Sequence, residues 1–362
     1  MPHTIILAGG GTGGHVYPAL AMGDALKARG HDVRYYGDGA RLEGRVAAQR
    51  GYTFRPVGAV PYPRAGVAAK LRFVLDLGRA TLHARRMLRE DAATLVLGVG
   101  GYVMAPTVFA AWTLRIPSVI HESNVAPGMA NRACARVARL VLLTYADTAR
   151  HLPGEVPSLV VGCPVAPKVL VGDRAAARAR YGLAPDLPVL LVVGGSLGAA
   201  TINAVALAAA TQARDWQILH VCGPRYHAEI LGAYGTVPAH VTLVDYEDRM
   251  GDAYAAADLV VCRAGSSTLA ELCAVGKASV LIPSPNVTDN HQEANARGLD
   301  RAGAARVVVE RGIDIPAVVA EIDRLLHQPE VLGAMGQAAK RLAGGDVAAQ
   351  VAVEIERRFP AP

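Results

Sequence analysis

The sequence predicts an α/β protein of two consecutive domains, each built on a doubly wound parallel sheet. Short runs rich in Val, Ile and Leu alternate with longer segments of helical periodicity, which is the pattern of repeated βαβ units. A glycine-rich segment follows a strand-like run twice, at residues 9–14 and 194–198, which we call the first and the second glycine loop. Because one hydrophobic core seldom holds as many as 362 residues, two domains are expected.

The expected strands are short and fall into two series. The first series comprises residues 4–8, 33–36, 94–97, 118–121, 140–143 and 159–161. After residues 164–167, Pro-Val-Ala-Pro, which have the character of a linker, the second series comprises residues 189–193, 217–221, 241–244, 259–262, 279–282 and 306–309. We therefore expect domains at 1–162 and 163–341, and a C-terminal helix within 342–362, from about 347 to 358, that is able to pack back on the first domain. Ligands of such sheets bind at the carboxyl ends of the strands, so a cleft faced by both sheets is the expected active site.

The composition narrows the class of protein. Hydrophobic residues make up 52% and charged residues 19%, which describes a globular chain rather than a disordered one. The five cysteines form no C-x-x-C pair, which is typical of reduced thiols in a cytosolic protein. We expect no signal peptide and no membrane-spanning helix, because no apolar stretch is long enough. The net charge of +6 is compatible with nucleic acid, an anionic membrane or phosphorylated substrates.

The first glycine loop matches the dinucleotide-binding pattern G-x-G-x-x-G. Gly9, Gly11 and Gly14 fit it, and Asp38 follows where a ribose-binding acid would lie, so a nicotinamide enzyme is one interpretation. A tight turn without ligand is another. In either case glycines let backbone N–H groups approach a negative or hydroxyl-rich ligand. His15 ends the loop, either as a structural residue or as a neutral imidazole that accepts a proton from an attacking hydroxyl.

The second half carries two further helix starts of this kind. Ser196 lies in the second glycine loop, and Ser267 and Thr268 follow the expected strand 259–262. Thr268 and Glu271 have the spacing of a capping box, which alone would explain both residues. The functional alternative is that the hydroxyl and N–H groups bind a diphosphate while Glu271 accepts hydrogen bonds from ribose hydroxyls.

Two polar clusters follow expected strands. Residues 289–295, Asp-Asn-His-Gln-Glu-Ala-Asn, suit the hydroxyl groups of a sugar, although a polar loop needs no ligand. Residues 121–124, His-Glu-Ser-Asn, come directly after a strand in the first half. Polar residues at the carboxyl end of a strand usually face the site of an α/β domain.

These blocks resemble the MurG family of glycosyltransferases, which add N-acetylglucosamine to the lipid-linked muramyl-pentapeptide precursor of bacterial peptidoglycan. The matching blocks occur in family order from Ile5 to about Gly303: GGTGGH at 10–15, GGYV at 100–103, HE-x-N at 121–124, GGS-x-GA at 194–199, CR-x-G at 262–265 with Glu271, and Gln292 with Asn295. The resemblance implies a GT-B fold, in which two Rossmann-like domains face a cleft. It implies an acceptor- and membrane-facing first domain and a second domain that binds UDP-N-acetylglucosamine.

The resemblance also implies roles for single residues of the second domain. Ser196 and Thr268 would contact the diphosphate, with Ser267 beside them, and Glu271 would bind the ribose. The backbone of Glu247, beside a ring-covering Tyr246, would recognise uracil.

The sugar and the acceptor would be held by residues of both domains. Gln292, Asn124 and the backbone around Ser266 would hold N-acetylglucosamine, with Asn131 and Asn295 as further substrate-binding residues. Thr12, Gly13 and Gly14 would line the acceptor side. The reaction would be one inverting displacement at the anomeric carbon by the muramyl 4-hydroxyl, with His15 as base and Glu122 as its assistant.

Three positions depart from the family pattern. Residues 162–166 are Gly-Cys-Pro-Val-Ala where the family usually has Gly-Asn-Pro-Val-Arg, so Ala166 offers no arginine near the donor phosphates. Arg263 and Lys168 are the candidates to replace it. The other departures are Leu197 and Ser123, each at a position where the family commonly has glutamine.

Residues 64–89 are strongly basic. Within this range Asp76 is the only acidic residue. The basic residues are Arg64, Lys70, Arg72, Arg79, Arg85, Arg86 and Arg89. Since apolar residues are interleaved at 71, 73–75 and 77, one interpretation is a solvated helix with its apolar side in the core. The other, supported by the resemblance, is a patch that docks on anionic lipid at the cytoplasmic face of the membrane, where each basic residue adds about 1 kcal/mol.

Other functions are also compatible with the sequence. They are a related GT-B transferase or nucleotide-sugar epimerase with a different acceptor, a nicotinamide-dependent oxidoreductase, and a non-enzymatic sugar-nucleotide sensor. The oxidoreductase explains neither Ser196 nor the helix start at 267–271. No Asp-x-Asp element stands beside the phosphate-type loops, so we expect no obligatory metal. We also expect no cofactor and no nucleic-acid partner.

Overall fold

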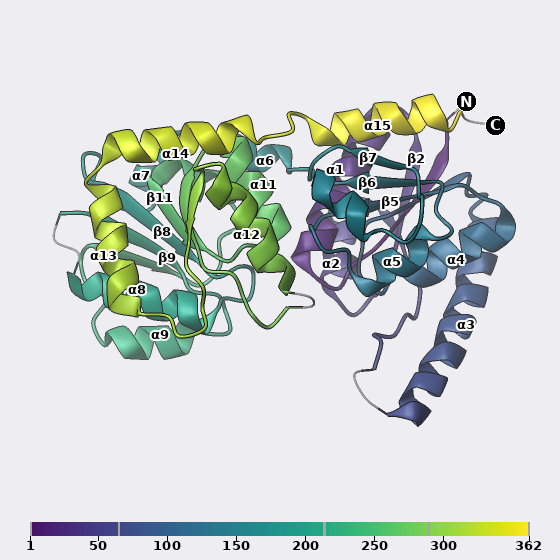
Figure 1. Cartoon of the computed structure of the whole chain (residues 1–362), viewed down its shortest axis with the longest axis horizontal. Coiled ribbons are helices and arrows are strands. Elements are labelled where there is room, and N and C mark those ends of the chain that lie inside the picture. Colours follow the sequence, from purple (N-terminus) through teal and green to yellow (C-terminus); the bar gives the residue numbers. More distant parts are fainter. Residues whose placement is uncertain (1, 64–65, 213–214, 288–289, 361–362) are drawn as a thin grey trace. The chain divides into compact units, whose positions relative to one another are not determined.

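The computed structural model of the protein describes residues 2–63, 66–212, 215–287 and 290–360 (Figure 1). The chain forms two compact units. Unit 1 consists of Met1–Ala166 and Asp346–Pro362, and unit 2 consists of Pro167–Gly345. Unit 1 is therefore assembled from two segments that are far apart in the sequence.

Unit 1 contains a parallel sheet in which seven strands, among the described residues, have the order β3-β2-β1-β4-β5-β6-β7. The strands are β1 Thr4–Ala8, β2 Asp32–Gly37, β3 Thr53–Pro56, β4 Leu95–Gly98, β5 Ser118–Glu122, β6 Leu140–Leu143 and β7 Ser158–Val160. The helices of this unit are α1 Gly13–Ala28, α2 Leu42–Gln49, α3 Val67–Glu90, α4 Met104–Leu114, α5 Met129–Ala135, the 3-10 helix η1 Ala146–His151, and α15 Val347–Arg358.

Helices cover both faces of this sheet. Alternate residues of β1 point to opposite sides, so Ile5 and Leu7 join one hydrophobic cluster while Ile6 and Ala8 join another. The first cluster includes residues of α1 and α15, and the second includes residues of α3 and α4. Because both faces are covered, the central strands β1, β4 and β6 are nearly continuous hydrophobic runs rather than alternating ones.

Helix α15 supplies part of the core of unit 1. Its Val351 and Ile355 are fully buried in the cluster that contains Ile5. At the surface, Glu356 pairs at 2.5 Å with Arg29, the residue that directly follows α1. In Figure 1 this yellow helix runs beside the elements of the N-terminal segment.

Unit 2 repeats the architecture with a parallel sheet whose described strands have the order β10-β9-β8-β11-β12-β13. The strands are β8 Val189–Val193, β9 Gln217–Val221, β10 Val241–Val244, β11 Leu259–Cys262, β12 Ala278–Leu281 and β13 Ala305–Val307. The helices are α6 Pro167–Leu170, α7 Arg174–Arg180, α8 Ala200–Gln212, α9 His227–Tyr234, α10 Met250–Ala256, α11 Ser266–Val275, α12 His291–Arg301, α13 Ile315–Leu326 and α14 Pro329–Arg341.

The predicted fold class is confirmed. The ends of the predicted strands lie within one residue of the observed ends, except that β13 ends two residues earlier than predicted. Strand β3 was not predicted from the sequence. It is four residues long, ends in Pro56, lies at the edge of its sheet and contains no fully buried residue. A short edge strand of this kind lacks the buried apolar run by which the other strands are recognised.

Each sheet reverses its strand order at one point, and the glycine loops lie there. In unit 1 the reversal is between β1 and β4, and in unit 2 it is between β8 and β11. The first glycine loop follows β1 and the second follows β8. Open α/β sheets bind ligands at such switch points, which directs attention to the loops after these four strands.

Among the described residues, none of the helices combines the length and the apolar character needed to cross a bilayer.

Candidate functional site

The first glycine loop is held by the strands and helix around it. The Gly10 N–H donates to the Gly100 carbonyl at 3.4 Å, and the Gly11 N–H donates to both carboxylate oxygens of Glu43, at 3.1 and 3.2 Å. The loop then leads into α1, whose first residue follows Thr12. Each of these bonds comes from the loop backbone, so the glycines are positioned before any ligand arrives.

His15 lies against the inner side of this loop. Its Nδ1 is 3.3 Å from the Gly10 carbonyl oxygen and 3.3 Å from the Thr12 hydroxyl. Because a carbonyl only accepts hydrogen bonds, this contact favours the neutral tautomer with the proton on Nδ1, which leaves the Nε2 lone pair as the basic site. Gly100, at a φ of +98°, makes room for the ring: a Cβ there would lie 2.8 Å from Nε2.

Residues 121–131 form a second polar group in unit 1. His121 is fully buried, its Nε2 donates to the Gly162 carbonyl at 2.8 Å, and the Ser123 hydroxyl lies 3.3 Å from its Nδ1. Burial, with a smaller contribution from the nearby His15 ring, lowers the pKa of His121 to about 4, so His121 is neutral at physiological pH. It therefore serves as a structural link at the end of β5.

Glu122 holds the loop that follows β5. The side chain is almost fully buried and accepts hydrogen bonds from the N–H groups of Asn124 at 2.8 Å and Gly128 at 3.2 Å. Burial raises the pKa of Glu122 to about 7, although these hydrogen bonds act in the opposite direction. Asn131, also buried, donates to the His121 carbonyl at 3.0 Å. The expected substrate residues Asn124 and Asn131 are thus tied to the same loop as Glu122.

In unit 2 the second glycine loop borders a polar hollow of about 380 Å³. Of the residues expected to bind substrate, Gln292 lines it, and its Oε1 accepts from the Ser284 N–H at 2.9 Å. Ser196 lies on the exposed turn between Gly194 and Gly198. The other lining residues are Gly194, Gly198, Ala199, Ala200, Thr201, Tyr226, Arg263, Ser284, Asn286 and Glu310.

The capping-box interpretation of Thr268 and Glu271 is wrong. The residue that precedes α11 is Gly265, which has no side chain, so Thr268 is the third residue inside the helix. The first helical hydrogen bond is donated by Leu269 to the Gly265 carbonyl at 3.0 Å. The polar residues 266–268 therefore line the positive end of α11 without a side-chain cap from the preceding residue.

Glu271 lies one turn further along α11. The Tyr254 hydroxyl donates to its Oε2 at 2.8 Å. Burial raises the pKa of the Glu271 carboxyl to about 7, and the bond from Tyr254 acts in the opposite direction. The residue nevertheless keeps some exposed surface. A carboxylate with one oxygen occupied and partial solvent access is able to accept hydrogen bonds from vicinal hydroxyl groups.

The side chain of Glu247 is occupied within unit 2. It accepts from the Tyr181 hydroxyl at 2.7 Å and from the Arg249 N–H at 2.6 Å. The neighbouring Tyr246 side chain is exposed. With its side chain engaged in this way, Glu247 has its backbone to offer for the contact with uracil that the resemblance implies.

Asn295 is fully buried on α12, whose first five residues belong to the polar cluster 289–295. Asp289 of that cluster lies outside the described residues. Asn290 donates to Glu293 at 2.7 Å within the same cluster.

Arg263 is engaged by a carboxylate that the sequence did not suggest. Its guanidinium donates to both oxygens of Glu310, at 2.7 and 2.9 Å, and to the Ile282 carbonyl at 3.0 Å. Lys168 instead donates to the Asp248 carbonyl at 3.2 Å. Glu310 and Ser284 follow β13 and β12, so the rule that sites form at the carboxyl ends of strands is the signal that could have identified them.

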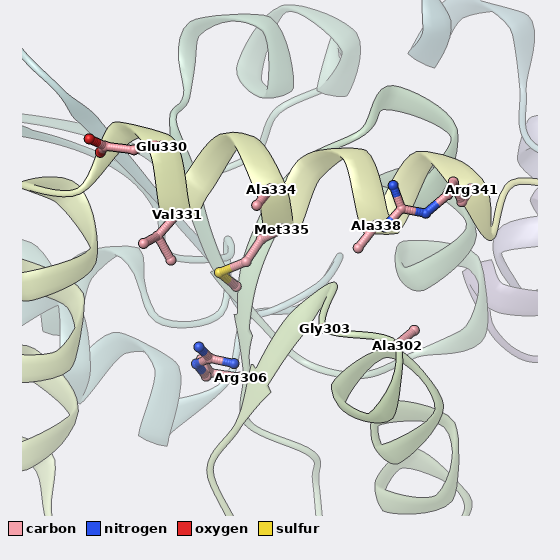
Figure 2. A pocket seen from close by; sticks show the side chains of 9 residues that line it. All are labelled: Ala302, Gly303, Arg306, Glu330, Val331, Ala334, Met335, Ala338 and Arg341. Carbon is pink, nitrogen blue, oxygen red and sulfur yellow. The ribbon is translucent and has the colours of Figure 1, made fainter.

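A larger hollow of about 480 Å³ lies elsewhere in unit 2, between α14 and the region where α12 leads into β13 (Figure 2). Figure 2 shows Met335 and Val331 of α14 directed toward Arg306. None of the residues predicted as site residues lines it, so we base the site on the strand-end loops. Its lining residues are Ala302, Gly303, Arg306, Glu330, Val331, Ala334, Met335, Ala338 and Arg341.

Among the described residues, one group has the spacing of metal ligands: Asp215, Asp323 and His327. Asp215 precedes β9, so the group lies at the amino end of that strand rather than at the carboxyl ends where the loops gather.

Comparisons with known proteins agree with this geometry. The family model described as the glycosyltransferase family 28 N-terminal domain matches residues 5–143, and that of the C-terminal domain matches residues 189–351. A relative from Acidithiobacillus ferrooxidans is 41% identical over 356 residues, 97% of each chain. Another from Clavibacter michiganensis subsp. michiganensis is 42% identical, over 96% of this chain and 94% of its own. Both are named UDP-N-acetylglucosamine--N-acetylmuramyl-(pentapeptide) pyrophosphoryl-undecaprenol N-acetylglucosamine transferase.

A solved structure gives the same result. The crystal structure of Acinetobacter baumannii MurG matches with a TM-score of 0.78 at 29% identity, covering 99% of this chain and 100% of that chain. Two doubly wound parallel sheets with ligand-type loops at their switch points, together with these matches, define the class: a glycosyltransferase of the GT-B fold. Within that class, the chain belongs to the MurG family of glycosyltransferase family 28.

Proposed function

We propose that the protein transfers N-acetylglucosamine from UDP-N-acetylglucosamine to the 4-hydroxyl of undecaprenyl-pyrophosphoryl-N-acetylmuramyl-pentapeptide, with inversion at the anomeric carbon. The product is the lipid-linked disaccharide precursor of peptidoglycan. The observation that carries this proposal is the pair of strand ends at the switch point of unit 2, where the second glycine loop follows β8 and the start of α11, preceded by Gly265, follows β11. The names of relatives that span nearly the whole chain support the same donor and acceptor.

The donor nucleotide binds to unit 2 in this proposal. Ser196, Ser267 and Thr268 contact the diphosphate, because hydroxyl and N–H groups at a helix N-terminus attract negative charge. Glu271 accepts hydrogen bonds from the ribose hydroxyls, with its orientation set by the 2.8 Å bond from Tyr254. The backbone of Glu247 and the exposed Tyr246 ring recognise uracil.

The sugar is held by polar groups from helices and loops of both units in the proposal. Gln292 of α12, the backbone around Ser266 and Asn124 of unit 1 contact N-acetylglucosamine, while the buried Asn295 and Asn131 belong to the elements that present these groups. Arg263 replaces the family arginine that is absent at Ala166, with Glu310 fixing its guanidinium plane through two hydrogen bonds.

His15 is the proposed general base, and Thr12, Gly13 and Gly14 line the acceptor side. The acceptor 4-hydroxyl oxygen bonds to the anomeric carbon while the bond from that carbon to the diphosphate oxygen breaks, so UDP leaves with the electron pair. The hydroxyl proton passes to Nε2 of His15, since Nδ1 faces the Gly10 carbonyl at 3.3 Å. Glu122 supports the site by holding the 123–128 loop rather than by taking the proton.

The acceptor is a lipid, and helix α3 is the proposed contact with the cytoplasmic face of an anionic membrane. Apolar side chains of its N-terminal half are largely exposed, so the interpretation with the apolar side in the core fits only the C-terminal half, where Ala84, Met87 and Leu88 are buried. In Figure 1 that N-terminal half projects beyond the rest of unit 1. Arg64 of the basic segment lies outside the described residues. The exposed apolar residues of α3 are Val67, Leu71, Val74 and Leu75 in this half, and Leu82 beyond it.

UDP release in the presence of UDP-N-acetylglucosamine and the lipid-linked muramyl-pentapeptide tests the proposal. We expect turnover by the wild type, loss of kcat in His15→Ala, and a raised KM for the donor in Glu271→Ala. Glu330→Ala, an exposed carboxylate at the other hollow, is the control and is expected to behave as wild type. Wild-type protein that is silent with this acceptor but active on another lipid would indicate a different transferase.

Membrane docking is tested separately by sedimentation with vesicles containing anionic lipid. Reversing the charges of Lys70, Arg72 and Arg79 is expected to abolish binding, whereas reversing three basic residues of unit 2 is not. Unchanged binding of the α3 variant refutes the assignment of this surface. The control residues are Arg301, Arg311 and Arg341.

A further inference from the structure

The carboxylate of Glu43 is completely buried beneath the first glycine loop. Its two oxygens accept from the Gly11 N–H at 3.1 and 3.2 Å, and one of them also accepts from the Asp38 N–H at 3.3 Å. Gly11 belongs to the first glycine loop, and Asp38 follows β2. One side chain therefore joins the two backbone segments where a dinucleotide-binding domain would hold its pyrophosphate and its ribose.

Two glycines leave the space that this carboxylate occupies. A Cβ added to Gly10 would collide with the Glu43 carboxylate, and a Cβ added to Gly37 would lie 2.8 Å from Glu43 Cγ. The absence of side chains at Gly10 and Gly37 thus makes room for the Glu43 side chain rather than for an external ligand.

Backbone N–H groups are the partners of this charge. A buried carboxylate is strongly unfavourable unless it is paired or hydrogen-bonded. Within the described residues, no ion pair involving Glu43 is found, and its hydrogen bonds come from the N–H groups of Gly11 and Asp38. Backbone N–H groups that converge on one position bind an anion in the same way as a loop of successive N–H groups does, and we call the position between the Gly11 and Asp38 N–H groups the nest. Here the nest is filled by the protein itself.

We infer that Glu43 is a built-in anion that fills the nest of the first glycine loop and thereby positions Thr12 and His15. The contacts run in sequence: Glu43 holds Gly11, the adjacent Gly10 carbonyl contacts His15 Nδ1, and the Thr12 hydroxyl contacts the same atom. Glu43 is a positioning residue, since it reaches the reaction only through His15. This role rests on the proposed function, in which His15 is the base.

The G-x-G-x-x-G pattern usually indicates a loop that binds the phosphates of a dinucleotide, and the contacts of Glu43 argue against that function here. The Gly11 N–H that would meet a dinucleotide phosphate already has a carboxylate partner, and a phosphate placed there would face a second negative charge. The first glycine loop is therefore closed to NAD-type cofactors although it matches their sequence pattern.

Three variants test the inference. Glu43→Gln keeps the size of the side chain but turns an N–H₂ group toward one of the backbone donors. Glu43→Ala leaves an empty nest of a size that formate can enter. Asp91→Asn is the matched control, because Asp91 is another nearly buried carboxylate of unit 1, bonded to the Tyr36 hydroxyl at 2.6 Å and to Arg55 at 2.8 Å.

Activity and hydrogen–deuterium exchange are measured together. In Glu43→Gln we expect kcat with the lipid acceptor to fall by about 10- to 100-fold, as small misplacements of a reacting group do, while the KM for UDP-N-acetylglucosamine stays within about twofold. Exchange in a peptide covering residues 9–15 is expected to accelerate. In Glu43→Ala, added formate is expected to slow that exchange and to restore part of kcat. Asp91→Asn is expected to lower Tm without changing exchange in residues 9–15.

Two results overturn the inference. In the first, Glu43→Gln shows the same kcat and the same exchange in residues 9–15 as the wild type. In the second, Asp91→Asn shows the lower kcat and the faster exchange in residues 9–15 that are expected of Glu43→Gln. If instead the wild type proves inactive with the lipid acceptor, the proposed function fails. The exchange and formate measurements still decide whether Glu43 fills the nest.

Discussion

Replacing Glu271 by glutamine is expected to make UDP binding independent of the Glu271 proton and to stabilise the protein at alkaline pH. The structural basis is the burial that raises the pKa of this carboxyl from 4.5 to about 7, against the opposing bond from Tyr254. If the ionised form is the one that accepts the ribose hydroxyls, protonation must weaken nucleotide binding. Glutamine has the same shape and cannot titrate.

The size of the binding effect follows from the pKa. With a pKa of about 7, the carboxylate is about one-tenth ionised at pH 6 and about nine-tenths ionised at pH 8. The wild type should therefore bind UDP about tenfold more weakly at pH 6 than at pH 8 from this group alone, which corresponds to about 1.4 kcal/mol.

Whereas UDP binding is expected to strengthen as the pH rises, the stability of the fold is expected to fall. Between pH 4.5 and about 7 the folded protein keeps a proton on Glu271 that the unfolded chain has released, so stability falls as the pH rises through this window. The difference of about 2.5 pKa units amounts to at most about 3 kcal/mol at pH 8. Glu271→Gln cannot lose stability in this way. The free energy of unfolding of this variant, relative to that of the wild type, should therefore increase between pH 5 and pH 8.

Isothermal titration of UDP at pH 6, 7 and 8, with denaturant unfolding at the same values, measures both effects. UDP itself titrates in this range, and the comparison of variant with wild type removes that contribution. Tyr254→Phe, which loses the bond that lowers the pKa, should shift the wild-type midpoint to higher pH. A Glu271→Gln protein with the wild-type pH slope would show that this carboxylate does not contact the nucleotide.

Three further variants have defined outcomes. His15→Ala should lower kcat by about 10²- to 10⁴-fold while the Kd of UDP, measured by calorimetry, stays within about twofold; equal turnover would exclude His15 as the base. Glu122→Ala should lower the free energy of unfolding by about 1–3 kcal/mol in a denaturant titration, because the N–H groups of Asn124 and Gly128 lose their acceptor, and an unchanged stability would contradict the role assigned to it. Serine at Leu71 and Leu75, which are 64% and 63% exposed, should weaken vesicle binding by about 2 kcal/mol per residue with an unchanged Tm, and a lower Tm would mean that these side chains pack on the protein.

The positions of the site loops could be predicted from the sequence because they depend on local patterns. A buried strand such as 189–193 is a continuous apolar run, and its carboxyl end fixes where the following loop begins. The same rule located the starts of α1 and α11 and the polar residues at the carboxyl end of β5, of which His121 and Glu122 still belong to the strand. It failed for the cap of α11, because Thr268 has capping chemistry but Gly265 has the extended backbone that precedes the helix.

The partners of the site residues could not be predicted in this way. Tyr254 lies 17 residues before Glu271, Arg263 lies 47 residues before Glu310, and Gly11 lies 32 residues before Glu43. Each contact depends on which strands become neighbours in the sheet, and no spacing within one helix or strand encodes it. Glu43 in particular is an ordinary polar residue of an eight-residue helix until the fold brings Gly10 and Gly37 around it.

The position of α15 has a consequence for how the protein is made. Val351 and Ile355, which complete the core around Ile5, leave the ribosome after every residue of unit 2. The unit whose synthesis begins first is therefore the last to complete its core, and during translation the surface that α15 covers stays exposed while unit 2 already has all its residues for folding. A nascent chain ending at residue 345 should consequently depend on chaperones for unit 1 alone.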